Sequence, residues 1–137
     1  KAAGGSVLQL DLVTALFKKY NVLGKIDGYA VHMYPAETSG PALVHAIDAA
    51  TRACRASETG LPCWITEWGF GNPGDGNHCI ADDSKRLQSM RNFNQAVACV
   101  ATQRKIQATY LFDFEQSPIF SVKRCGRLLE SSRIFAR

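Results

Sequence analysis

Apolar residues along this chain alternate between helical spacing and short continuous runs. Apolar positions three or four residues apart predict helices over four ranges: 8–20, 41–55, 83–103 and 128–136. Short runs rich in β-branched and aromatic residues predict strands over three ranges: 26–34, 62–66 and 108–114. Because strands joined by helices pair in parallel, we expect an α/β fold of about three parallel strands with flanking helices.

The longest predicted helix, over residues 83–103, has one apolar face. The residues expected to face inward are Leu87, Met90, Phe93, Asn94, Val97 and Val100. Asp83 or Ser84 is suitably placed to cap its first turn. The pattern therefore predicts an amphipathic helix packed on the sheet.

Polar side chains stand at the end of each predicted strand. His32 and Tyr34 end the first strand, Glu67 follows the second, and Asp113 and Glu115 end the third. The carboxyl ends of parallel strands meet at one edge of a sheet, where α/β folds place their chemistry. A lone glutamate there is more often an ordinary surface charge, but three polar strand ends on one edge predict a site.

Composition narrows the class of protein. The chain has 137 residues, 46% of them hydrophobic and 20% charged, which suits one globular domain over residues 1–137. The net charge of +4 is spread over short Lys/Arg pairs, so we expect no nucleic-acid partner. No apolar stretch approaches the ~20 residues of a membrane span, and a signal peptide is expected to be absent or already removed.

Five cysteines lack the CxxC spacing of zinc sites. Cys54, Cys63 and Cys99 fall in predicted helices and a strand, where we expect small buried hydrophobic residues. Cys79 and Cys125 fall in predicted loops and could pair in an oxidising compartment.

The polar loop after the second strand contains no phosphate-binding motif. His78 lies there near Asp82 and Asp83, but such clusters usually face solvent, and His45 is expected on a helix surface. We therefore expect no metal and no nucleotide.

Three segments resemble a known family. Residues 27–35 (Asp-Gly-Tyr-Ala-Val-His-Met-Tyr-Pro) and 64–70 (Trp-Ile-Thr-Glu-Trp-Gly-Phe) look like strands six and seven of clan A glycoside hydrolases. Residues 110–114 (Tyr-Leu-Phe-Asp-Phe) and the segment after them are similar to the eighth strand, its loop and the last helix. Those enzymes are (β/α)8 barrels, so the resemblance implies a partial TIM barrel, a C-terminal half-barrel.

The resemblance also implies roles for individual residues. Glu67 matches the nucleophile of a retaining glycosidase, and His32 and Tyr34 match positions that contact sugar or hold that carboxylate. Trp68 either stacks on a sugar ring or packs under the loop. Asp113 is expected to accept a hydrogen bond from a sugar hydroxyl. The resemblance implies no cofactor.

The family's general acid/base is a Glu that follows Asn at the end of strand four, and no Asn-Glu pair occurs in this chain. The Trp often found on strand eight is also absent, with Phe112 and Phe114 the nearest candidates. The expected function is thus hydrolysis of a glycosidic bond with the acid/base carboxylate missing from this chain.

Length bears on the expected partners. A complete barrel takes about 250 residues. The remaining strands are therefore expected from a longer polypeptide, a complementing N-terminal barrel chain or a homo-oligomer, unless the chain is the product of a decayed reading frame. The alternative is a non-catalytic half-barrel module that binds itself, a partner chain or carbohydrate. The usual location of polysaccharide-degrading relatives favours a secreted or periplasmic location for this chain.

Overall fold

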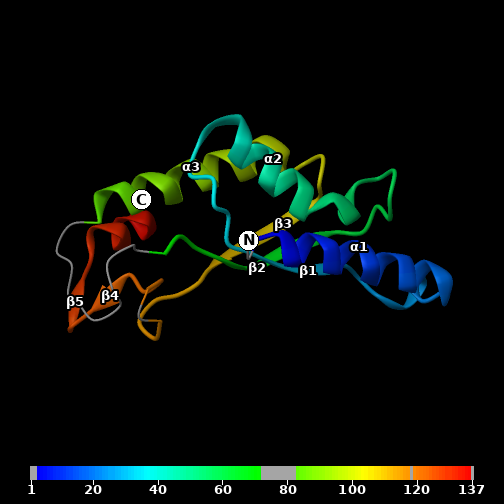
Figure 1. Ribbon diagram of the computed structural model, residues 1–137, viewed down its shortest axis with the longest axis horizontal. Coiled ribbons are helices and arrows are strands. Elements are labelled where there is room, and N and C mark those ends of the chain that lie inside the picture. Colours follow the sequence, from blue (N-terminus) through cyan, green and yellow to red (C-terminus); the bar gives the residue numbers. More distant parts are fainter. Residues whose placement is uncertain (1–2, 72–82, 118, 137) are drawn as a thin grey trace.

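A parallel three-stranded sheet forms the centre of the protein. The computed structural model describes residues 3–71, 83–117 and 119–136. The strands are β1 (Tyr29–Met33), β2 (Cys63–Trp68) and β3 (Ile106–Leu111), in the order β1-β2-β3 with both pairs parallel. The helices are α1 (Ala3–Lys19), α2 (Gly40–Ala50) and α3 (Ser84–Val100), and Figure 1 shows α2 and α3 together on one side of the sheet. The predicted α/β organisation is confirmed.

The core lies between the sheet and these two helices. Leu43 and Ile47 of α2, Phe93 of α3 and Ile65 of β2 are all fully buried. Along β1, buried and exposed residues alternate, so one face of the strand packs on the core while the other remains open. Asn94 is exposed, and its predicted inward position is wrong. His45 lies on the surface of α2, as expected.

Element boundaries differ from the predicted ones where local hydrogen bonds intervene. The helix expected to reach residue 55 ends at Ala50, where the Thr51 hydroxyl donates to the carbonyl of Ile47 at 2.7 Å. A 3₁₀ turn, η2 (Arg52–Cys54), follows. Another short turn, η1 (Leu23–Lys25), precedes β1 and delays the start of that strand to Tyr29. β3 begins two residues earlier than predicted and ends at Leu111.

The C-terminal helix predicted over residues 128–136 is observed only in part, as a shorter 3₁₀ helix. The chain forms a hairpin of β4 (Lys123–Arg124) and β5 (Arg127–Leu128), followed by the 3₁₀ helix η3 (Glu130–Phe135). The two residues between the strands, Cys125 and Gly126, have φ values of 48° and 71°. Two consecutive positive φ angles are what a two-residue hairpin turn of the primed type requires.

β2 carries an irregularity that decides which way its last side chains point. Strict alternation would place Glu67 on the face of Cys63 and Ile65, which are fully buried. Next to β1 the pairing skips one residue of β2 just after Ile65, and the pairing with β3 also shifts before Trp68. One extra residue reverses the faces of the side chains that follow. Trp68 is consequently 3% exposed, whereas the Glu67 side chain is 35% exposed.

A disulfide joins Cys54 of η2 to Cys63 at the start of β2, with the two Cα atoms 5.9 Å apart. Both cysteines are fully buried, but the prediction that they are unpaired hydrophobic residues is wrong. Cys99 is free but exposed, so its predicted burial is also wrong. Cys125 is disulfide-bonded, and its predicted partner Cys79 lies outside the described residues.

Replacing Cys54 and Cys63 together by Ala should lower the free energy of unfolding. The bridge closes a loop of sequence separation 9, and opening a loop of that size costs about 2–3 kcal/mol. Urea unfolding of wild type and the double variant measures the difference, with Cys99→Ala as the control. Equal unfolding midpoints for wild type and the double variant would contradict the expectation.

Among the described residues, no helix is both long enough and apolar enough to cross a bilayer.

Candidate functional site

The carboxylate of Glu67 lies at the carboxyl end of β2, in contact with two side chains of the β1 segment. The Tyr34 hydroxyl donates to Glu67 Oε2 at 2.6 Å, and His32 Nδ1 lies 3.4 Å from the same oxygen. His32 is the register partner of Glu67, and Tyr34, two residues further along, shares its face of the sheet. The structure thus brings together three of the residues singled out in the sequence, at the predicted edge of the sheet.

The surroundings of Tyr34 keep its hydroxyl protonated. Burial raises the pKa of Tyr34 well above its ordinary value, and the hydrogen bond to Glu67 and the charges of Glu67 and Asp113 raise it further. The phenol is therefore neutral at physiological pH and acts as a donor to the carboxylate. The His32 contact is an ion pair only when the imidazole is protonated.

Trp68 does not border this open site. Its indole is stacked on Phe93 of α3, with ring centroids 4.1 Å apart and planes 12° apart, and it meets Phe70 edge-on. Of the two positions expected for Trp68, a packed one is observed, with the residue 3% exposed and its ring lying on α3. The proposed stacking on a sugar is a misassignment, because the irregularity in β2 turns this side chain into the core.

Asp113 organises its own loop. The Ser117 backbone N–H donates to Oδ2 at 2.7 Å, and the Ser121 hydroxyl donates to Oδ1 at 2.6 Å. The peptide bond between Phe112 and Asp113 is cis. Both carboxylate oxygens are therefore engaged within the loop, and the contact of Asp113 with a sugar hydroxyl stays a prediction. Glu115, the other charge predicted here, is exposed and forms an ion pair with Lys123 at 2.9 Å.

An aromatic wall beside Tyr34 was missed in the sequence. The ring of Phe120 lies 4.9 Å from that of Tyr34, and Phe112 meets both rings at 6.1 Å and 5.9 Å. Phe114, named as a candidate platform, is exposed and pairs with Phe135 instead. Phe120, an aromatic residue in the loop after the third strand, was the available signal, but it lies too far from Tyr34 along the chain for the pattern to predict that the two rings would meet.

Gly69 allows this wall to approach β2. A Cβ atom at Gly69 would lie 2.5 Å from the carbonyl oxygen of Phe112 and 3.1 Å from the ring of Phe120. Gly69→Ala should therefore destabilise the fold by about 1–3 kcal/mol, the usual cost of overpacking. Gly71→Ala is the matched control, because its Cβ would meet Phe120 at an ordinary 3.8 Å. Thermal unfolding of both variants tests the expectation, and equal midpoints would contradict it.

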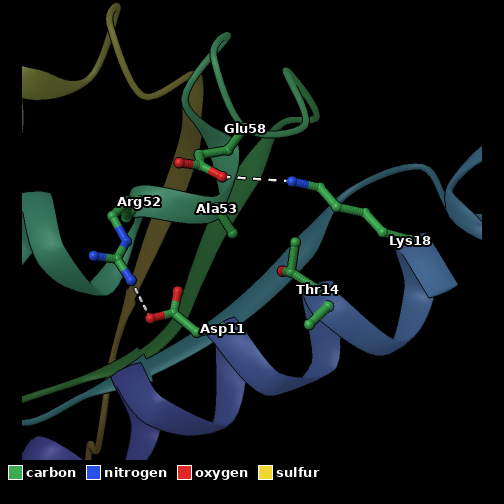
Figure 2. A pocket seen from close by; sticks show the side chains of 7 residues that line it. Asp11, Thr14, Lys18, Arg52, Ala53 and Glu58 are labelled. Carbon is green, nitrogen blue, oxygen red and sulfur yellow. Dashed lines mark hydrogen bonds and ion pairs between the residues drawn. The ribbon is translucent and has the colours of Figure 1, made fainter.

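A separate pocket of about 260 Å³ lies between α1 and η2 (Figure 2). Its lining residues are Asp11, Thr14, Ala15, Lys18, Arg52, Ala53 and Glu58. The charged groups pair with one another, Asp11 with Arg52 and Lys18 with Glu58 at 3.5 Å. Thr14 hydrogen-bonds Tyr29, the first residue of β1, so the pocket lies toward the opposite end of the sheet from Glu67. It adds nothing to the chemistry of the Glu67 site.

Within the part of the chain that the structure describes, no cluster of three potential metal ligands occurs. His78 and Asp82 lie outside that part. Asp83 is buried and accepts a hydrogen bond from the backbone of Ser131 at 2.7 Å, so it is committed to internal contacts.

Comparison with known proteins identifies the architecture. The chain is similar in structure to a beta-glucosidase from Exiguobacterium marinum, with a TM-score of 0.54 and 20% sequence identity over 80% of this chain and 34% of that chain. The fold is thus that of a partial (β/α)8 barrel, spanning about a third of the relative's length. No curated protein sequence matches the chain. A family model described as "Glycosyl hydrolase catalytic core" matches residues 13–133. The chain therefore belongs to the glycosyl hydrolase catalytic core family.

Proposed function

We propose that this chain supplies the nucleophile of a retaining glycosidase, Glu67, which acts on a carbohydrate substrate together with an acid/base carboxylate from another segment. The observation that carries the proposal is the pair of contacts on one oxygen of Glu67, a hydrogen bond from Tyr34 at 2.6 Å and the Nδ1 atom of His32 at 3.4 Å. Both contacts are made to Oε2, so Oε1 is the oxygen available to attack an anomeric carbon.

Such an arrangement suits a nucleophile. The hydrogen bond from Tyr34 to one oxygen fixes the orientation of the carboxylate, which lowers the entropic cost of reaching a reactive geometry. His32 is 56% exposed in its side chain, so it can also contact a sugar hydroxyl beside the carboxylate.

The acid/base partner has to come from elsewhere. Retaining glycosidases place their two carboxyl groups about 5–5.5 Å apart. Near Glu67, the described carboxylate of Asp113 is engaged by Ser117 and Ser121. Glu115 is paired with Lys123 in the exposed loop. We therefore propose that the acid/base carboxylate lies on a strand outside the three described here.

Unpaired strand edges support a completing partner. Within the described sheet, β1 and β3 each pair on one side only. Exposed apolar side chains are found in and next to the elements that flank both edges: Leu12 and Leu16 of α1 and Tyr20 just after it, and Tyr110 of β3 and Phe114 just after it. Open edges and exposed apolar patches are typical of surfaces that bind further polypeptide. We propose that further strands of the barrel cover both, from a longer polypeptide, a complementing chain or a second copy.

A glycoside that traps the covalent intermediate tests this function. A 2-deoxy-2-fluoro glycoside with a good leaving group is incubated with the chain alone and with the chain extended by the reading frame upstream of Lys1. Mass spectrometry of the digested protein is expected to locate the added sugar on Glu67, in a form that is complete as a barrel. Rapid glycoside hydrolysis with the label on a different carboxylate would refute Glu67 as nucleophile.

The non-catalytic alternative has a different signature. A half-barrel module that associates with a second copy would show the mass of a dimer in solution and bind sugars without turnover. The solution mass of the chain, followed by a panel of chromogenic glycosides, separates the two functions.

A further inference from the structure

Arg86, in the first turn of α3, is almost fully buried, with 4% of its side chain exposed. Its Nη1 donates to the carbonyl oxygens of Ile119 at 3.3 Å and Phe120 at 3.1 Å, and its Nη2 donates to that of Ser121 at 2.8 Å. One guanidinium thus holds three consecutive backbone carbonyls. In the sequence, Arg86 forms a short basic pair with Lys85, a pattern that predicts only an exposed charge.

The planar fork of arginine explains why this residue type occupies the position. Nη1 and Nη2 each carry two hydrogens at fixed angles, so a guanidinium can bind several carbonyls at once. Nη2 also contacts the Ser131 hydroxyl and forms an ion pair with Asp83 at 2.9 Å. Asp83 in turn accepts the backbone N–H of Ser131, which ties the same cluster to η3.

The carbonyls that Arg86 holds belong to the aromatic wall of the Glu67 site. Phe120 is the middle residue of the three, and its ring lies 4.9 Å from the Tyr34 ring. Gly69 lies on the other side of the ring, so close that a Cβ atom there would come within 3.1 Å of it. Tyr34 donates to Glu67. The contacts therefore run without a gap from Arg86, through Phe120 and Tyr34, to the carboxylate.

We propose that Arg86 is a positioning residue for the Glu67 site: by holding the backbone of residues 119–121, it keeps the Phe120 ring on Tyr34 and so fixes the hydrogen bond from Tyr34 to Glu67. The role of Arg86 in catalysis rests on the proposed function, in which Glu67 is the nucleophile. The positional claim itself concerns only contacts within the chain. It can be tested without a substrate.

The titration of Tyr34 reports on this wall. Burial is the largest cause of its raised pKa. If Phe120 leaves the Tyr34 ring, water reaches the phenol and its pKa falls toward about 10, the ordinary value for tyrosine. Tyrosine labelled with ¹³C at Cζ gives a separate NMR signal for each phenol, and that of Tyr34 is identified with Tyr34→Phe. The Tyr29 signal, from a buried ring at the start of β1, shows whether each variant is folded.

Three changes carry the test. Arg86→Lys keeps the charge beside Asp83 but removes the planar fork. The double change Asp83→Asn with Arg86→Gln removes the fork and the carboxylate that pairs with it together, in case the first variant does not fold. Phe120→Leu removes the ring while Arg86 remains. All three are expected to bring the midpoint of the Tyr34 titration down.

Ser131→Ala is the matched control. It removes another contact of Arg86 but leaves the three carbonyl contacts in place, so the Tyr34 midpoint should not move. An unchanged midpoint in both Arg86 variants, or an equal fall in Ser131→Ala, overturns the proposal. Because the titration needs no sugar, a failure of Glu67 to react with the fluoro glycoside leaves this result standing, and the two proposals fail independently.

Discussion

Glu67→Gln is expected to abolish glycoside hydrolysis by the completed barrel, with kcat reduced by about 10⁴–10⁶-fold, the range seen when an enzyme loses its nucleophile. Glutamine has nearly the shape of glutamate and can still accept the hydrogen bond from Tyr34, now 2.6 Å from the carboxylate. It cannot form the covalent glycosyl intermediate. Steady-state rates on an activated aryl glycoside measure the loss.

Two comparisons give this result its meaning. Glu115→Gln makes the same chemical change at a carboxylate that is 55% exposed in the loop after β3, and its rate should match that of the wild type. Small anions such as azide should partly restore hydrolysis in Glu67→Ala, where they fill the space of the missing side chain. A Glu67→Gln protein that is as active as wild type would remove Glu67 from the mechanism.

The sequence predicted the order of elements and the edge of the sheet where the polar residues meet. Apolar runs and glycine or proline boundaries are local signals, and they were sufficient for β1, β2 and β3 to within a few residues. The rule that parallel strands end at one edge placed Tyr34 and Glu67 near each other, and their pairing was what the resemblance to the family implied. These features depend on short-range patterns, which a sequence displays directly.

The last residues of β2 could not be predicted because the strand does not alternate regularly. The extra residue beside β1 leaves Glu67 partly exposed and turns Trp68 onto Phe93. No residue type in Ile-Thr-Glu-Trp marks that irregularity. The aromatic next to the carboxylate therefore looked like a sugar platform, although its ring belongs to the core.

The C-terminal region shows a different limit. Leu128, Leu129, Ile134 and Phe135 have spacings that suit a helix. Positive φ angles at Cys125 and Gly126 fold the chain into a hairpin first, and the Leu129 N–H bonds to the carbonyl of Val122 at 2.9 Å. Tertiary contacts with α3 then hold the segment. One of them joins Arg86 to Ser131, which lies 45 residues further along the chain. Spacing alone carries no information about such distant partners.

Asp83→Asn is expected to destabilise the fold by about 3–5 kcal/mol, because breaking a buried ion pair leaves its partner charged and uncompensated. Asp83 and Arg86 are 1% and 4% exposed in their side chains and lie 2.9 Å apart. Arg124 is 8% exposed, its guanidinium nitrogens have no hydrogen-bond partner in the described structure, and its charge is among the causes that lower the pKa of Arg86. Asp83 is thus the counter-charge for a region with two buried cations.

Denaturant unfolding measures this loss, which is a large share of the 5–15 kcal/mol typical of a domain. Glu115→Gln again serves as the control, because its ion pair with Lys123 is exposed and such pairs contribute about 0–1 kcal/mol. Pairing Asp83→Asn with Arg86→Met should recover part of the stability, since the double change leaves one buried cation where the single change leaves two. If Asp83→Asn were as stable as Glu115→Gln, water would have to solvate Arg86 or another group would have to pair with it. Asp83 would then not be the residue that holds α3 to the C-terminal segment.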